Sequence, residues 1–146
     1  MESHFKTFAE LSTTELYKIL QLRSEVFVVE QDCVYQDIDD ADPYAVHQLM
    51  FKEDKLAAYA RILPPGSYFE QLSIGRIVTA SQFRRTGLGH QLMKEAIDYC
   101  QVNFSDLPIK ISAQQYLIKF YKSHQFQTQG EGYLEDGIPH IAMIRK

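Results

Sequence analysis

The segment Arg84-Arg85-Thr86-Gly87-Leu88-Gly89 gives the clearest indication of the fold of this 146-residue chain. An apolar stretch typical of a strand, residues 72–79, precedes the segment, and an amphipathic helix is expected directly after it. Main-chain N–H groups at the start of a helix lack partners within the helix and lie at the positive end of its dipole. Because glycine has no Cβ atom, a phosphate can approach the main chain closely at Gly87 and Gly89. The segment therefore predicts a loop that cradles the phosphates of a cofactor, with its two arginines adding positive charge.

Other phosphate-binding motifs are missing from the sequence. It contains no Gly-x-x-x-x-Gly-Lys-Ser/Thr loop and no Gly-x-Gly-x-x-Gly motif, which argues against ATP and NAD. Taken alone, Arg-x-x-Gly-x-Gly also fits a plain helix start with a surface arginine and glycines for tight packing. Its place between a strand and an amphipathic helix, with a second strand and an aromatic helix following, favours the phosphate-binding interpretation.

The hydrophobic pattern predicts alternating strands and helices on both sides of this loop. Strands are expected at 4–8, 45–51, 56–63, 72–79, 109–113, 126–130 and 139–144, and helices from Thr13, at 88–101 and around 116–124. Ser12 and Glu15 form a capping box before the first helix, and a four-residue turn, 52–55, joins the strands on either side of it. Because a strand, a crossover helix and a second strand normally form a parallel right-handed unit, the strands at 72–79 and 109–113 should be neighbours.

Length, composition and charge limit the classes of protein. A chain of 146 residues has the usual size of one domain, so a single domain over residues 1–146 is expected. The net charge of −4 gives no positive field for holding a nucleic acid. No stretch approaches the ~18 apolar residues of a membrane span, and the first residues do not resemble a signal peptide. We therefore expect a cytoplasmic protein that binds neither nucleic acid nor membrane.

Cysteines, histidines and acidic residues indicate no metal site. Cys33 and Cys100 lie far apart in the sequence and are expected to be reduced and packed. The histidines lack the i, i+4 spacing of a helical zinc site. Four aspartates within residues 32–43, a segment expected to be a loop or broken helix, lack the glycine and terminal glutamate of a calcium loop, so we expect a solvated acidic face that weakly attracts cations. These aspartates are Asp37, Asp39, Asp40 and Asp42.

Several segments together resemble the GNAT (GCN5-related N-acetyltransferase) superfamily, and more closely its ElaA-like branch. These segments are Leu22-Arg23, Val26 to Gln31, Tyr35-Gln36-Asp37, Ile74 to Val78, Arg84 to Gly89, Phe120-Tyr121 and Glu135 to His140. The resemblance runs through most of the chain. It implies an α+β fold, the GNAT-like acyl-CoA N-acyltransferase fold, in which helices flank a central, mostly antiparallel twisted sheet with a splayed parallel pair of strands.

The resemblance also implies a binding site for acetyl-CoA without a metal. The loop would hold the pyrophosphate, and the end of the preceding strand would pair through its main chain with pantetheine, which would enter between residues 77–79 and 111–113. The residues implied are Ile77, Val78, Thr79, Arg84, Arg85, Thr86, Gly87, Leu88, Gly89 and Gln114. Two positions depart from the family pattern, since Gln114 replaces a frequent asparagine and Gln125 a frequent glycine.

The implied reaction transfers an acetyl group from acetyl-CoA to a primary amine by direct attack in a ternary complex. Such a reaction needs a neutral amine, a stabilised oxyanion and a proton for the leaving thiolate. Tyr121 is the expected general acid, although a helix aromatic is more often part of a core. The N–H of Val78 is the expected group that polarises the carbonyl. His140, near Glu135 and Asp136, and Glu30 stay open as alternatives for the base.

Two alternatives to this enzyme remain. A domain that binds acyl-CoA as a sensor or docking module needs the same cradle but no base. The region from Arg23 to Glu30 is also similar to acyl-homoserine-lactone synthases, which would use another acyl donor, although the chain is short for that class. The sequence does not name the amine acceptor: a small-molecule amine, a peptide N-terminus and a lysine side chain all stay open. It also leaves a homodimer open.

Overall fold

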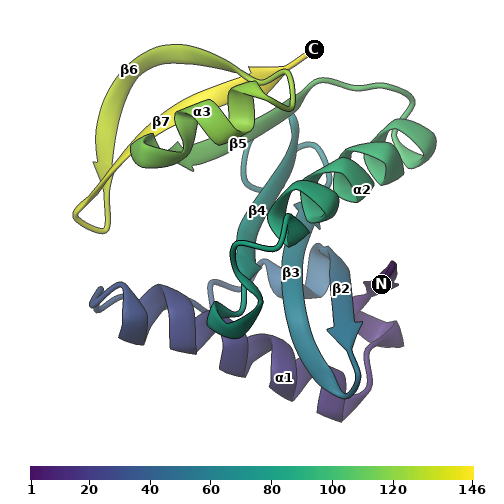
Figure 1. Ribbon diagram of the computed structural model, residues 1–146. Helices are drawn as coiled ribbons and strands as arrows, with labels where there is room; N and C mark the ends of the chain where they lie inside the picture. Colours follow the sequence, from purple (N-terminus) through teal and green to yellow (C-terminus); the bar gives the residue numbers. More distant parts are fainter.

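A seven-stranded sheet forms the centre of the computed structural model, which describes residues 1–146 (Figure 1). The strands are β1 (Ser3–Thr7), β2 (Val46–Lys52), β3 (Lys55–Leu63), β4 (Leu72–Thr79), β5 (Ile109–Gln114), β6 (Gln127–Glu135) and β7 (Ile138–Arg145). The helices are α1 (Thr13–Arg23), continued by the π-helix η2 (Ser24–Glu30), α2 (Leu88–Asn103) and α3 (Ile118–Lys122). Short 3-10 helices are η1 (Phe8–Glu10), η3 (Asp42–Tyr44), η4 (Ser81–Phe83) and η5 (Gln115–Leu117). None of the helices combines the length and the apolar character that crossing a lipid bilayer requires.

The strand order is β1-β2-β3-β4-β5-β7-β6, and every neighbouring pair is antiparallel except β4 and β5. These two strands are parallel and pair at only two positions, Leu72 with Ile109 and Ser73 with Lys110. Beyond Ser73 the strands diverge, so the rest of β4 has no strand partner on that side. The predicted α+β fold with a splayed parallel pair is therefore confirmed.

A bulge in β4 lies where this strand leaves β5. The register with β3 shifts between Gly75 and Val78, so that β4 carries one residue more than β3 in this interval. Within it, Arg76 has a left-handed backbone with a φ of 48°. A bulge bends and twists its strand locally, and here it accompanies the divergence of the parallel pair.

Helices cover both faces of the sheet (Figure 1), with α1 on one face and α2 and α3 on the other. The apolar residues predicted to form the inner face of α2 are all buried. These are Leu92, Met93, Ala96, Ile97 and Cys100. Cys100 and Cys33 are buried free thiols, as expected.

The element boundaries agree with the sequence pattern in most places and differ at the hairpins. The capping box of Ser12 and Glu15 begins α1 as predicted. The expectation of a four-residue turn after β2 is wrong, because Lys52 pairs with Lys55 and leaves a two-residue turn. The last hairpin is longer than expected, since β6 continues to Glu135.

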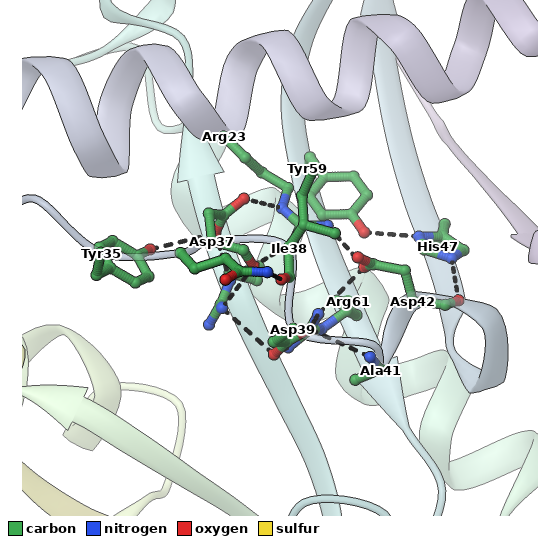
Figure 2. Close-up of polar contacts among 12 residues, drawn as sticks. Arg23, Tyr35, Asp37, Ile38, Asp39, Ala41, Asp42, His47, Tyr59 and Arg61 are labelled. Carbon is green, nitrogen blue, oxygen red and sulfur yellow. Dashed lines mark hydrogen bonds and ion pairs between the residues drawn. The ribbon is translucent and has the colours of Figure 1, made fainter.

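Residues 32–45 form a loop that a network of ion pairs fixes to the sheet (Figure 2). Arginines from α1, β3 and β4 supply the positive charges, and aspartates of the loop supply the negative ones. The contacts are Arg23 to Asp37 (2.8 Å) and Asp42 (2.6 Å), Arg61 to Asp39 (2.8 Å) and Asp42 (3.1 Å), and Arg76 to Asp37 (2.7 Å) and Asp39 (3.3 Å). The expectation of a solvated acidic face holds for Asp40 but is wrong for Asp37 and Asp42, which are buried in ion pairs with arginines from distant parts of the chain.

The positive charges of Arg23, Arg61 and Arg76 are balanced by the negative charges of three aspartates, which lowers the free-energy cost of burying them. Arg23 is fully buried, and Asp37 and Asp42 are nearly so. Burial alone would raise the pKa of Asp42, but the hydrogen bond and charge of Arg23 overcome this effect and lower it. Burial likewise opposes the effect of Arg61 on Asp39, whose pKa is lowered to about 2. The stability that Asp39 adds is therefore complete above its ordinary pKa of 3.8 and is lost as the pH falls towards about 2.

Asp42→Asn should destabilise the protein by roughly 3 kcal/mol, because it leaves Arg23 and Arg61 buried with less negative charge. Urea unfolding at pH 7 measures this loss. Asp40→Asn is the matched control, since Asp40 is exposed and makes no ion pair, and it should change the stability by less than about 0.5 kcal/mol. Equal losses in the two variants would contradict a stabilising role for the network.

Candidate active site

A cavity of about 900 Å³ extends from the glycine loop, along the diverging strands β4 and β5, to the β6–β7 turn. It joins the two faces of the sheet. Ile111 and Ala113 belong to the core beneath α2, so the alternating residues Ser112 and Gln114 face the other side. Of the site residues predicted from the sequence, all except Thr86 line this cavity. They are Glu30, Ile77, Val78, Thr79, Arg84, Arg85, Gly87, Leu88, Gly89, Gln114, Tyr121 and His140.

The glycine loop presents uncapped main-chain donors to this cavity. Gly87 is the N-cap of α2 with a φ of 82°, and no side chain caps the helix. The first N–H groups of α2 are therefore free to bind an anion. Arg85 also has a left-handed backbone, with a φ of 63°. The Thr86 hydroxyl points away from this role, because it donates a hydrogen bond to the Phe83 carbonyl at 2.7 Å.

Arg84 and Glu30 form an ion pair beside the loop. The Arg84 guanidinium donates to both Glu30 oxygens, at 2.6 and 3.0 Å, and to the Thr79 carbonyl at 3.2 Å. Glu30 thus contacts the glycine loop, and both of its carboxylate oxygens accept hydrogen bonds from Arg84. Arg85 makes no ion pair and is exposed, so its charge is available at the mouth of the cavity.

The open edge of β4 presents alternate main-chain groups to the cavity. The N–H of Ala80 donates to the Ala57 carbonyl at 2.8 Å, so it faces β3. Since Thr79 pairs with Ala58 and Val78 with Tyr59, the alternation of an antiparallel ladder turns the Val78 N–H towards β3 as well. The N–H of Thr79 faces the gap instead. Val78 therefore lines the cavity but does not direct its N–H into it, in contrast to the expectation from the sequence.

Tyr121 lies on α3 with its ring in the core and its edge at the cavity. The side chain is 6% exposed, and its hydroxyl makes no hydrogen bond within the protein. Burial raises the pKa of Tyr121, which keeps the hydroxyl protonated. The ring is thus part of the core, while the protonated hydroxyl has no hydrogen-bond partner in the protein.

His140 and Glu135 come together on the opposite side of the cavity. The Nδ1 atom of His140 lies 2.7 Å from the Ile138 carbonyl, which can only accept a hydrogen bond, so Nδ1 carries the hydrogen. In the neutral ring, Nε2 is therefore the acceptor, and it lies 3.4 Å from Oε2 of Glu135. The other Glu135 oxygen accepts hydrogen bonds from the hydroxyls of Tyr68 at 3.1 Å and Ser112 at 3.3 Å.

Some residues of the site carry no signal in the sequence. Tyr68 lies in the irregular segment between β3 and β4, and Ser112 is one polar residue of a short strand. The close approach of His90 to His124, 2.9 Å between ring nitrogens, joins residues 34 positions apart. Gln114 donates weakly to Gln31 at 3.4 Å.

No three His, Cys, Asp or Glu side chains gather in an arrangement that could hold a metal ion.

Comparison with known proteins agrees with this geometry. The sequence model of the acetyltransferase (GNAT) domain family matches residues 10–146, so the chain belongs to the GNAT family. It is similar to protein ElaA of Escherichia coli (strain K12), with 45% identity over 140 residues, 94% of this chain and 92% of ElaA. The crystal structure of an acyl-CoA N-acyltransferase from Pseudomonas aeruginosa has a TM-score of 0.94 and 42% identity, with both chains covered completely. The family performs acyl transfer with an acyl-CoA as co-substrate.

The fold is also similar to that of BjaI, a CoA-dependent acyl-homoserine lactone synthase. The TM-score is 0.80 at 16% identity, and the match covers 98% of this chain and 82% of BjaI. At this identity the likeness concerns the fold alone.

Gly87→Ala should destabilise the protein by about 1 kcal/mol, because alanine is strained at this left-handed helix start. Chemical denaturation of both proteins measures the difference. Gly75→Ala provides the control, since the φ of Gly75 is not positive and no heavy atom lies within 4 Å of the added Cβ. Similar losses at the two positions would show that backbone strain is not the cause.

Proposed function

We propose that the protein is an N-acetyltransferase that moves the acetyl group of acetyl-CoA to a primary amine by direct attack in a ternary complex. The observation that supports this proposal best is the continuity of one cavity. At one end lie the uncapped amides of α2, and at the other lie His140 and Glu135. Donor and acceptor could thus meet where β4 and β5 diverge.

The end of the cavity at the start of α2 suits the pyrophosphate and the pantetheine amides of coenzyme A. The free N–H groups at the start of α2 and the charge of Arg85 would hold the pyrophosphate. The unpaired edge of β4, including the N–H of Thr79, would pair with the amides of pantetheine, since main-chain groups without partners need hydrogen bonds. The ion pair with Glu30 would keep Arg84 beside the loop, and we assign Glu30 this positioning role in place of that of the base.

The acceptor end suits the deprotonation of an amine. His140 would take a proton from the incoming ammonium at Nε2, because the Ile138 carbonyl fixes the hydrogen of the neutral ring on Nδ1. The neutral amine would then attack the thioester carbonyl. The C–N bond forms and the C–S bond breaks. Tyr121 would give its hydroxyl proton to the leaving thiolate, and the second proton, which the nitrogen loses as the amide forms, would restore the Tyr121 hydroxyl.

Release of CoA thiol with a panel of primary amines tests this function, with two variants that separate the proton transfers. His140→Gln and Tyr121→Phe should each lower kcat on the order of 100-fold at pH 7. His140→Gln should also remove the rise of kcat/KM with pH that a general base produces, because the group that accepts the proton is gone. Tyr121→Phe should keep this rise.

Tyr17→Phe is the control, since Tyr17 is 69% exposed on α1 and does not line the cavity. It should leave kcat unchanged. Calorimetric binding of CoA by both variants would show that the fold and the donor site persist. Tight binding of acetyl-CoA without thiol release for any amine would instead favour an acyl-CoA sensor.

A further inference from the structure

The arginines on the acceptor side of the cavity are fully matched by carboxylates. Arg61 and Arg76 both line the cavity, but each guanidinium contacts two aspartates of the loop at 2.7–3.3 Å. The one cation of β5 is Lys110. Its ammonium lies 4.8 Å from the centre of the Phe69 ring, and Lys110 does not line the cavity. No free cation is therefore present here to bind a carboxylate of the acceptor.

Glu135, in contrast, faces the buried side chain of His140, with its Oε2 atom 3.4 Å from Nε2. His140 is 6% exposed, and its Nε2 makes no hydrogen bond. In the neutral ring Nε2 and the Glu135 Oε2 atom are both acceptors, and they lie 3.4 Å apart. An ammonium group has three N–H donors and could bridge the two acceptors. The geometry thus fits a protonated amine that binds Glu135 and transfers its proton to His140.

A second carboxylate, Asp136, follows directly in the β6–β7 turn. Its side chain lines the cavity, is exposed, and takes part in no hydrogen bond or ion pair. Its main chain is held in place, because its carbonyl accepts a hydrogen bond from the Cys33 thiol at 3.1 Å. Asp136 therefore adds to the cavity lining a negative charge without an ion-pair partner, one residue after Glu135.

Two hydrogen bonds connect neighbouring segments at this end of the cavity. The Tyr68 hydroxyl joins the segment between β3 and β4 to Glu135, and the Cys33 thiol joins the segment after η2 to Asp136. Both bonds end on the β6–β7 turn, so three separate segments meet there. These contacts fix Glu135 and Asp136 relative to the two neighbouring segments.

We propose that the acceptor is a small aliphatic diamine or polyamine, with the reacting ammonium bound at Glu135 and His140 and a second ammonium at Asp136. This proposal rests on the proposed function, because it names the acceptor of that reaction. It predicts selection by the group at the far end of the acceptor. Asp136 attracts a cation at the far end of the acceptor. It repels a carboxylate at that end, and no free arginine is present to bind one.

Three amines of equal chain length test this selection: 1,4-diaminobutane, butylamine and 4-aminobutanoate. At low salt, kcat/KM for the diamine should exceed that for butylamine roughly three- to fivefold, the range of a solvent-exposed ion pair. The carboxylate-bearing amine should react roughly tenfold more slowly than butylamine. Raising the salt concentration should reduce both ratios, because salt screens exposed charges.

Two variants separate the roles of the carboxylates. Asp136→Asn should bring the diamine-to-butylamine ratio close to one, and asparagine tolerates the left-handed backbone of this residue. Glu135→Gln should raise KM for both amines and keep the ratio. Glu131→Gln is the control, since Glu131 is an exposed carboxylate of β6 that does not line the cavity.

The possible failures are distinguishable. Equal turnover of the three amines, a preference for 4-aminobutanoate, or turnover only of other amines would overturn the diamine proposal and leave acetyl transfer intact. No release of CoA thiol with any amine would contradict both the proposed function and this acceptor.

Discussion

The strands β4 and β5 pair at only two positions, and the site depends on the divergence of the two strands beyond these positions. A strand inside a sheet normally has its main-chain donors and acceptors satisfied on both sides. Here one side of β4 stays open beside a cavity, next to a helix that begins without a cap. The same divergence exposes alternate N–H groups of a strand and the positive end of a helix dipole to one cavity.

The ion-pair network links this divergence to the acceptor side. Arg76 lies in the β4 bulge, and its guanidinium contacts Asp37 and Asp39 in the loop of residues 32–45. Arg23 connects the same loop to α1. Since removing one member leaves a partner charge uncompensated in the interior, the network stabilises the loop and the bulge together. The arginines that contact the loop are thereby occupied by its aspartates.

Sequence periodicity predicted the parts of this structure that short-range patterns determine. The inner face of α2, the limits of β4 and the capping box of α1 follow from spacing over a few residues, and the glycine loop follows from main-chain geometry. The network was not predictable in this way, because Arg23 and Arg76 meet Asp37 across 14 and 39 positions. The direction of the Val78 N–H depends on the register with β3, which the sequence of β4 does not contain. The bond between Tyr68 and Glu135 spans 67 positions, so spacing along the chain does not reveal it.

Residue-resolved amide hydrogen exchange of β4 tests the role of the open strand edge most directly. Saturating acetyl-CoA should slow exchange at Thr79 roughly tenfold or more, because pantetheine would bond to this N–H. The Val78 amide, which already faces β3, should change much less. Unchanged exchange at Thr79 in a protein that calorimetry shows to be saturated would contradict the account.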